Sequence, residues 1–236
     1  MRSGVGAVVP AAGRGERFGS LVAKALARVA GKPLILHCLQ ALQKSPAIRW
    51  IVVVVRPTDQ AHVRRLVRRH RLTKVSGVVT GGSSRAQSVA HGIAALPPQA
   101  RWVVVHDGVR PCVTQQLIEQ VVRHAKRHGA VASGLPASVT VKAVDPQQHV
   151  RLTLDREGLW LIQTPQAFRR DWMADALVRA NHGLEQFPDD VAILEWAGFP
   201  VQMVPGDPLN IKVTTREDLM LAEAILKRRV QKSEIR

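Results

Sequence analysis

Short apolar runs alternate along this chain with segments of helical periodicity, and polar turns separate them. Apolar runs that are too short for helices predict buried strands, and they occupy residues 7–9, 51–55, 75–80, 102–105 and 201–204. Helices are expected at residues 33–44, 57–70, 114–128, 170–183 and 190–198 and after Thr215. Apolar strands that alternate with helices are typical of a parallel sheet covered on both faces. The pattern therefore predicts the α/β class: a Rossmann-like, mostly parallel twisted sheet with helices on both faces.

Residues 136–157 show a different pattern, in which apolar and polar residues alternate one by one. Two alternating segments, 136–142 and 150–156, flank a turn at Asp145-Pro146, which predicts a β-hairpin. Two strands are too few to be stable alone in water, so the hairpin is expected to pack against another surface. No internal repeat, low-complexity segment or linker is visible. We therefore expect a single domain over residues 1–236, from which residues 136–157 protrude as an arm.

The first predicted strand ends in a glycine-rich loop. Residues 9–19 read Val-Pro-Ala-Ala-Gly-Arg-Gly-Glu-Arg-Phe-Gly, and Lys24 follows. Glycine allows positive φ and lets a ligand approach the backbone without meeting a Cβ atom. Such loops at the carboxyl end of a first strand usually hold phosphate on their N–H groups, and Arg17 and Lys24 are placed to meet negative oxygens. The alternative, a surface turn with solvated cations, explains one glycine but not the whole run.

The loop matches neither of the common phosphate-binding motifs. A dinucleotide fingerprint requires a small residue where Phe18 stands and an acidic residue about twenty positions later. No Asp or Glu lies between Glu16 and Asp59. The Gly-Lys-Ser/Thr of a P-loop is absent as well. The sequence thus excludes the NAD-binding and P-loop classes.

Two later strand ends also carry polar groups. Residues 81–88, Gly-Gly-Ser-Ser-Arg-Ala-Gln-Ser, follow the third strand, and residues 106–111, His-Asp-Gly-Val-Arg-Pro, follow the fourth. The carboxyl ends of parallel strands share one edge of the sheet, where ligands collect. The alternative for the second segment is a structural turn with an Asp107–Arg110 pair. Because three loops converge on one edge, we expect a binding site there.

The composition is that of a globular protein. Of the 236 residues, 46% are hydrophobic and 22% are charged, which is an ordinary balance. The longest apolar run, residues 50–55, is far too short to cross a bilayer, and no signal peptide is visible. Cys38 and Cys112 show no metal-ligand spacing, so a reduced, cytoplasmic protein without a membrane partner is expected.

The formal net charge of +16 is the unusual feature of the composition. Basic surfaces attract polyphosphates, so nucleic-acid binding is one interpretation. The other is a solvated helix face, because residues 63–69 place basic pairs between apolar ones at helical spacing. Aromatic residues make up only 4% of the chain, and none is a tyrosine, so base-stacking platforms are scarce. Specific nucleic-acid binding is therefore not expected, and a small anionic substrate accounts for part of the charge.

Several motifs, taken in order, resemble those of one enzyme family. They are Val-Pro-Ala-Ala-Gly at 9–13, Gly-Gly at 81–82 with Arg85 and Ser88, Arg110-Pro111, Asp155-Arg156 before Gly-Leu-Trp, Thr164-Pro165-Gln166, and Asn210-Ile211-Lys212-Val213-Thr214. The first motif alone indicates only a nucleotidyltransferase, whereas the last three are more specific. From end to end the chain is similar to the 2-C-methyl-D-erythritol 4-phosphate cytidylyltransferases.

That resemblance implies transfer of CMP from CTP to a polyol phosphate, with Mg²⁺ bound mainly through the CTP phosphates and no metal ligand assigned to the protein. It implies catalytic roles at the reacting phosphates for Arg17, Lys24 and Lys212. The nucleotide-binding residues that it implies are Ala11, Ala12, Gly13, Gly15, Gly82 and Ser88. Those for the acceptor, 2-C-methyl-D-erythritol 4-phosphate, are Asp107, Arg110, Thr140, Arg156 and Thr164. It further implies a homodimer, in which the arm brings Thr140 and Arg156 to the neighbouring subunit's site.

Four positions depart from the family pattern. Ala23 replaces a proline before Lys24, Ser83 an acidic residue, Val139 an aspartate and Pro188 a threonine. The last two lie on the acceptor side, so a cytidylyltransferase for another polyol phosphate, such as ribitol 5-phosphate, is the near alternative. A non-catalytic, nucleic-acid-binding relative is the alternative from another class.

Overall fold

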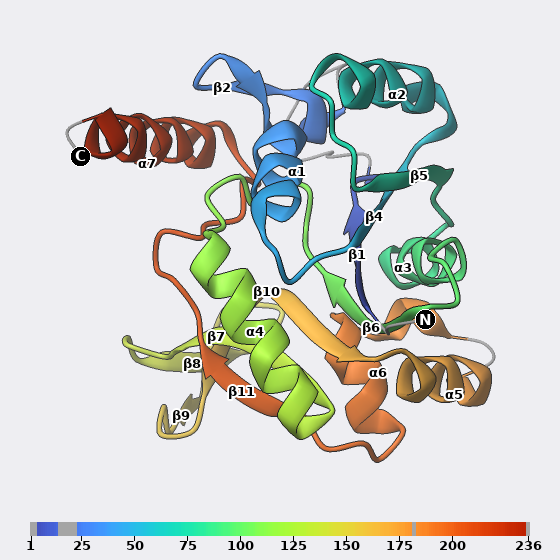
Figure 1. The fold of residues 1–236 in the computed structure, drawn as a ribbon. Coiled ribbons are helices and arrows are strands. Elements are labelled where there is room, and N and C mark those ends of the chain that lie inside the picture. Colours follow the sequence, from blue (N-terminus) through green and yellow to red (C-terminus); the bar gives the residue numbers. More distant parts are fainter. Residues whose placement is uncertain (1–3, 14–22, 181–182, 235–236) are drawn as a thin grey trace.

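The structure is a computed structural model that describes residues 4–13, 23–180 and 183–234 (Figure 1). In these residues a central sheet has seven strands in the order β11-β7-β10-β6-β1-β4-β5. Their bounds are β1 (Gly4–Pro10), β4 (Trp50–Val55), β5 (Val75–Thr80), β6 (Ala100–Val105), β7 (Ala130–Pro136), β10 (Trp160–Arg169) and β11 (Gln202–Pro205). Strand β10 runs antiparallel to β6 and β7, and every other neighbouring pair is parallel. The predicted mostly parallel sheet is confirmed.

Helices cover both faces of this sheet, as predicted. One face packs on α1 (Leu34–Lys44), α2 (Gln60–Arg69) and α4 (Gln115–His128), and the other on α3 (Arg85–Ala94), α5 (Arg170–Ala180) and α6 (Asp190–Trp196). Successive side chains of a strand point to opposite faces. Ala7 and Val9 of β1 accordingly belong to the first core and Val8 to the second. Buried on both faces, the strand is apolar throughout, which is why its sequence shows no alternation.

A third, smaller core holds the C-terminal helix α7 (Arg216–Glu234) against the loop after β6, where Cys112 packs with Ala222. Thr215 and Asp218, which stand at capping-box spacing in the sequence, cap the start of this helix: the N–H of Thr215 donates to Asp218 Oδ2 at 2.9 Å, and the N–H of Asp218 donates to Thr215 Oγ1 at 3.2 Å. The short elements are β2 (Arg28–Val29), β3 (Lys32–Pro33) and the 3₁₀ turns η2 (Lys24–Leu26), η3 (Pro57–Asp59) and η4 (Leu184–Gln186).

The sequence patterns missed two strands of the central sheet. Strand β7 is built mainly from small residues, and β10 carries the buried polar side chains of Gln163, Thr164 and Gln166. Neither strand therefore shows a bulky apolar run, which is the signal that revealed the other strands. Together they add an antiparallel pair to the parallel part of the sheet.

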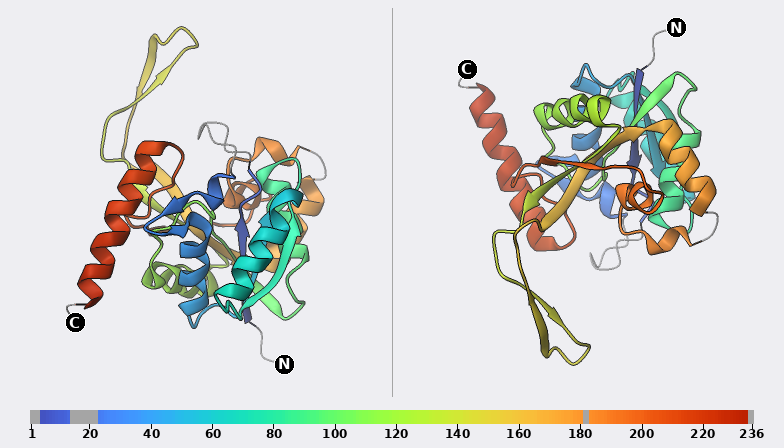
Figure 2. Two further views of the ribbon diagram at one scale, coloured as in Figure 1. Left: turned by 90° about the horizontal axis from the view of Figure 1, so that it is seen from above. Right: turned by 90° about the horizontal axis from the view of Figure 1, so that it is seen from below.

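The arm leaves the sheet where β7 and β10 part. Its strands are β8 (Val141–Val144) and β9 (Val150–Leu154), and they pair antiparallel. The predicted hairpin is confirmed, but its first strand begins five residues later than expected, because Pro136 still pairs with Trp160 in the main sheet. Figure 2 shows the hairpin projecting well beyond the body of the molecule. No helix among the described residues is long and apolar enough to span a membrane.

Candidate active site

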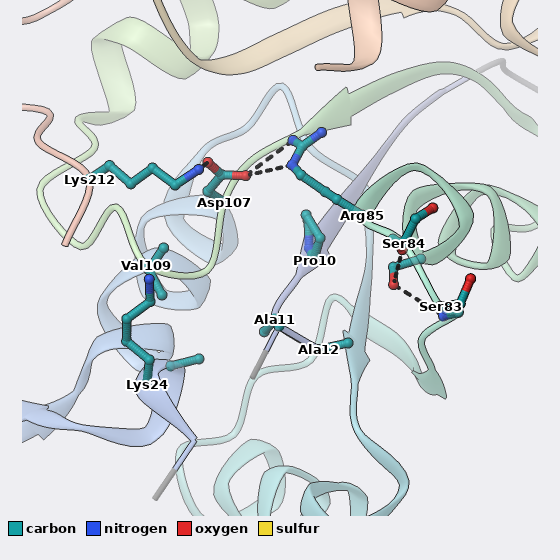
Figure 3. Close-up of a pocket in the computed structure, with 14 residues that line it drawn as sticks. Pro10, Ala11, Ala12, Lys24, Ser83, Ser84, Arg85, Asp107, Val109 and Lys212 are labelled. Atoms are coloured by element: carbon teal, nitrogen blue, oxygen red, sulfur yellow. Dashed lines mark hydrogen bonds and ion pairs between the residues drawn. The ribbon is translucent and has the colours of Figure 1, made fainter. Parts of the chain in front are cut away.

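A cavity of about 720 Å³ opens at the carboxyl edge of the sheet. It lies where the loops after β1, β5 and β6 meet, which confirms the predicted convergence of three strand ends (Figure 3). Lys24 and Lys212 bring ammonium groups to it from two further segments. Its lining residues are Pro10, Ala11, Ala12, Gly13, Lys24, Ala25, Gly82, Ser83, Ser84, Arg85, Ser88, Asp107, Val109 and Lys212.

One wall of the cavity consists of backbone and small side chains. The loops after β1 and β5 approach each other so closely that a Cβ atom on Gly81 would lie 2.5 Å from Cβ of Ala12. The Ser88 hydroxyl accepts from the N–H of Gly82 at 3.1 Å and donates to the carbonyl of Ser84 at 2.9 Å. Ser88 thus holds the glycine turn in place, and Ser84 caps the start of α3 through the N–H of Gln87. We call the wall formed by residues 10–13 and 81–84 the glycine wall.

The opposite wall carries a buried carboxylate surrounded by cations. Asp107 is 5% exposed, and its Oδ1 lies 3.1 Å from Nη2 of Arg85. Its Oδ2 lies 3.1 Å from Nζ of Lys212 and 3.7 Å from Nε of Arg110. Burial by itself raises the pKa of the Asp107 carboxyl, but Arg85, Lys212 and Arg110 together outweigh it and hold the pKa well below its usual value. Asp107 is therefore ionised at neutral pH and orients the cations around it.

Arg85 also binds a second carboxylate, which the sequence analysis did not assign to the site. Its Nη1 and Nη2 donate to Oδ1 and Oδ2 of Asp190 at 3.0 and 2.8 Å. Asp190 is 1% exposed, and burial raises the pKa of its carboxyl against the opposing effect of Arg85. The sequence contained a signal, because two adjacent aspartates, Asp189 and Asp190, stand where a helix begins and one cap is enough. Asp189 caps α6 by accepting from the N–H of Ala192, so Asp190 is free for another role.

Beneath Asp107, a neutral histidine organises the loop after β6. His106 is fully buried, and burial lowers its pKa to about 4. Its Nε2 lies 3.2 Å from the carbonyl oxygen of Arg110, which can only accept, so Nε2 carries the proton. Its Nδ1 then accepts from the Thr164 hydroxyl at 3.2 Å, and that hydroxyl accepts from the N–H of Asp107 at 3.0 Å. This chain of hydrogen bonds fixes both ends of the 107–110 turn.

Two residues predicted to bind the acceptor lie behind the cavity surface. Thr164 is 4% exposed and Arg110 is 8% exposed, and neither lines the cavity. Nη1 of Arg110 donates to the carbonyl of Asn210 at 2.9 Å, and the Asn210 amide donates to the carbonyl of Thr164 at 2.7 Å. The pKa of the Arg110 guanidinium is lowered by burial, against the attraction of Asp107. In this structure both side chains brace the wall that presents Asp107 and Lys212.

The remaining predicted residues lie apart from the cavity or outside the described residues. Thr140 and Arg156 are exposed in the arm, where Nη1 of Arg156 donates to the carbonyl of Ser138 at 3.2 Å. Gly15 and Arg17 fall outside the described residues. Ala11, Ala12, Gly13, Gly82 and Ser88 all line the cavity, as do Lys24, Lys212 and Asp107.

A mostly parallel α/β sheet with a small-residue wall facing a cationic one is the arrangement of an enzyme that holds nucleotide phosphates. The family model for 2-C-methyl-D-erythritol 4-phosphate cytidylyltransferase matches residues 5–228. The protein of that name from Syntrophus aciditrophicus is 42% identical over 229 residues, which cover 97% of this chain and 98% of that protein. The one from Desulforamulus reducens is 41% identical and covers 94% of this chain and 96% of its own.

Solved structures agree with the sequence comparisons. The 4-diphosphocytidyl-2C-methyl-D-erythritol synthase of Anaerococcus prevotii superimposes with a TM-score of 0.82 at 28% identity, over 95% of this chain and 96% of that one. The 2-C-methyl-D-erythritol 4-phosphate cytidylyltransferase of Thermus thermophilus gives 0.76 at 28% identity, over 96% of this chain and all of that one. The chain belongs to the 2-C-methyl-D-erythritol 4-phosphate cytidylyltransferase family.

Proposed function

We propose that this protein transfers CMP from CTP to the phosphate of 2-C-methyl-D-erythritol 4-phosphate and releases pyrophosphate, a step of isoprenoid precursor synthesis by the non-mevalonate pathway. The observation that carries the proposal is the contrast between the two sides of one cavity. The glycine wall offers small side chains and space, and the opposite wall presents Lys212 held on the buried Asp107. Family membership supplies the identity of the two substrates.

The chemistry requires charge stabilisation more than proton transfer. A phosphate monoester is largely ionised near neutral pH, so an oxygen of the acceptor phosphate attacks the α-phosphorus without a general base. As that P–O bond forms, the bond from the α-phosphorus to the bridging oxygen breaks and pyrophosphate leaves with the charge. Lys24 and Lys212 line the cavity, and with Arg17 they are the proposed partners of this developing charge. His106 stays neutral below the wall and takes no proton.

The nucleotide is proposed to lie on the glycine wall. Ala11, Ala12, Gly13 and Gly82 are small, so we expect this wall to leave room for a pyrimidine and little for a purine, and Ser88 holds Gly82 in place. Gly15 is assigned to the nucleotide by the family resemblance. CTP should therefore be used in preference to ATP and GTP. UTP is the more demanding comparison, because hydrogen bonds at one ring position distinguish it from CTP.

The acceptor is proposed to lie against Asp107, backed by Arg110 and Thr164, with help from a second subunit. The arm's apolar side chains are exposed, so a partner surface is required to cover them. In the proposed homodimer Thr140 and Arg156 reach the acceptor phosphate at the neighbouring site.

We propose that Mg²⁺ binds together with CTP, mainly through the CTP phosphates, whose negative charge it neutralises. The described residues contain no group of three or more His, Cys, Asp or Glu side chains that could hold a metal ion. Asp107 is the sole carboxylate among the described residues that line the cavity, and cations lie within 3.1 Å of both of its oxygens. These residues therefore suit an ion held by the triphosphate oxygens. We propose the cytoplasm as the compartment, which the two free cysteines, Cys38 and Cys112, support.

Pyrophosphate release tests the function directly. Purified protein is given CTP and Mg²⁺ with 2-C-methyl-D-erythritol 4-phosphate, with ribitol 5-phosphate, or with no acceptor, and the first mixture is repeated with ATP, GTP and UTP. We expect release only with CTP and the methylerythritol phosphate. Faster release with ribitol 5-phosphate would transfer the assignment to that polyol phosphate. Val139 and Pro188 are the reason for this comparison, because they depart from the family pattern on the acceptor side. Equal use of ATP and CTP would contradict the proposed base pocket.

A further inference from the structure

Four side chains of alternating charge form a row that ends at the cavity. Asp190 binds Arg85 with both carboxylate oxygens, at 3.0 and 2.8 Å. Arg85 in turn donates from Nε and Nη2 to Oδ1 of Asp107, at 3.3 and 3.1 Å. The other oxygen of Asp107, Oδ2, lies 3.1 Å from Nζ of Lys212. Figure 3 shows Arg85 and Lys212 reaching Asp107 from opposite sides.

The row is anchored at one end and faces the cavity at the other. Asp190 is 1% exposed, and the N–H groups of Asp190 and Val191 both donate to Oε1 of the buried Gln166, at 3.2 Å. The side chain of Lys212 is 42% exposed and lines the cavity. Asp190 therefore cannot shift without breaking several hydrogen bonds. The Lys212 side chain is free to adopt other rotamers unless a contact, such as the one with Asp107, holds it.

We propose that Asp190 is a positioning residue for Lys212, which acts through Arg85 and Asp107 to set where the ammonium group stands over the reacting phosphates. With Asp190 holding it by two hydrogen bonds, Arg85 stays against the wall and occupies Oδ1 of Asp107. Oδ2 is thereby turned to Lys212. Ionic contacts at low local dielectric are strong and lose much when a partner moves, so the position is passed along the row. This inference rests on the proposed function, which places Lys212 at those phosphates.

Asp190→Asn removes the charge at the anchored end while conserving side-chain size. Arg85 then keeps one of its two hydrogen bonds to residue 190 and loses the ion pair, so the charge of Asp107 draws its guanidinium toward the cavity. Misplacement of a reacting group by about 1 Å costs up to ~100-fold in rate, and we expect kcat to fall about tenfold while KM for CTP changes less than about twofold. Asp171→Asn is the matched control, because it breaks an exposed Asp–Arg pair with Arg169 and should leave both constants unchanged.

A double-mutant cycle separates positioning from a general structural role. If Asp190 acts through Lys212, the variant carrying both Asp190→Asn and Lys212→Ala should have the kcat of Lys212→Ala alone, within about twofold. If the two losses multiply, Asp190 does not act through Lys212 and the inference is wrong. Should Asp190→Asn fail to fold, Arg85→Gln breaks the row at its second member, whose side chain is 31% exposed, and enters the same cycle.

A crystal structure of the Asp190→Asn protein, or of Arg85→Gln in its place, gives an answer that does not depend on activity. We expect Nζ of Lys212 to leave Oδ2 of Asp107, and an unchanged contact of 3.1 Å would overturn the inference. Wild-type protein that is inactive with every acceptor would instead count against the proposed function, and the crystal structure would still decide whether the row positions Lys212.

Discussion

The cavity and the arm both depart from the usual arrangement, in which polar side chains are exposed and apolar side chains are buried. Around the cavity, charged and polar side chains are buried: His106 and Asn210 have no exposed surface, and Asp107 has 5%. In the arm, large apolar side chains are exposed, with Leu152 at 56% and Val139 at 66%. Buried charge is tolerated only when it is paired, and exposed apolar surface usually marks a contact to be made.

This difference separates the groups that find partners within the chain from those that do not. The buried charges satisfy one another within the chain, through contacts that join β6, β10, α3 and α6. The apolar face of β9 finds no such partner among the described residues, since Val150 and Leu152 remain more than half exposed. The charges around the cavity are thus paired within one chain, whereas the apolar face of the arm stays exposed and is the surface that the proposed homodimer would cover.

The largest expected effect is at the cavity, where Lys24 and Arg17 are assigned to the triphosphate. Lys24→Ala and Arg17→Ala should each lower kcat by about 10²–10³, because loss of one group that meets developing charge typically costs that much. KM for the acceptor should change far less, since neither residue is assigned to the alcohol. Steady-state kinetics measure this, with Lys32→Ala as a control that removes an exposed lysine bonded to Gln40. Near-normal turnover in either variant would remove that residue from the proposed machinery.

Subunit mixing tests whether the arm completes a neighbour's cavity. Lys24→Ala and Arg156→Ala proteins are each expected to be nearly inactive, and co-expression should restore about a quarter of wild-type activity. The reason is that random pairing makes half of the dimers mixed, and each mixed dimer has one site with both defects and one with neither. If Arg156 acts within its own subunit, every site keeps one defect. A mixture that stays inactive although mixed dimers are shown to form would therefore rule out the shared site.

The apolar face of the arm should matter for assembly and not for folding. Leu152→Asp places a charge where a partner must cover an apolar group, so the dimer should dissociate at concentrations at which the wild type stays paired. The thermal unfolding midpoint of the monomer should be unchanged, because the Leu152 side chain is 56% exposed in its own chain. Sedimentation or light scattering measures the effect, and Val178→Asp, at a 78% exposed position on α5, is the control. A stable Leu152→Asp dimer would place the interface elsewhere.

The last prediction concerns stability in acid and not turnover, and it rests on the buried His106. Burial lowers its pKa from 6.5 to about 4, so between these values the unfolded chain binds a proton that the folded chain does not. Stability should therefore rise with pH across this window, and acid from pH 6.5 to 4 should cost about 3 kcal/mol through this group. The difference between wild type and His106→Gln in urea unfolding at several pH values isolates the contribution. Equal curves for wild type and His106→Gln would show that His106 is not held neutral by burial.

Local pattern in the sequence was enough for every α-helix of the described residues except α3, for five of the central strands, for the hairpin and for the three loops of the cavity. Periodicity, glycine turns and caps such as Thr215 with Asp218 depend on neighbours within a few residues, so a single chain segment contains the information. The same holds for Ala11, Ala12 and Gly82, which follow strand ends that must meet at one edge.

Tertiary structure alone decided the rest, because it depends on groups far apart in the sequence. Strand β10 owes its place to pairing with β6 and β7 and not to an apolar run of its own. Asp190 lies 105 positions from Arg85, and only packing of α6 beside α3 makes them partners. Whether Arg110 and Thr164 face the cavity or brace it from behind likewise follows from the hydrogen bonds that burial obliges them to make.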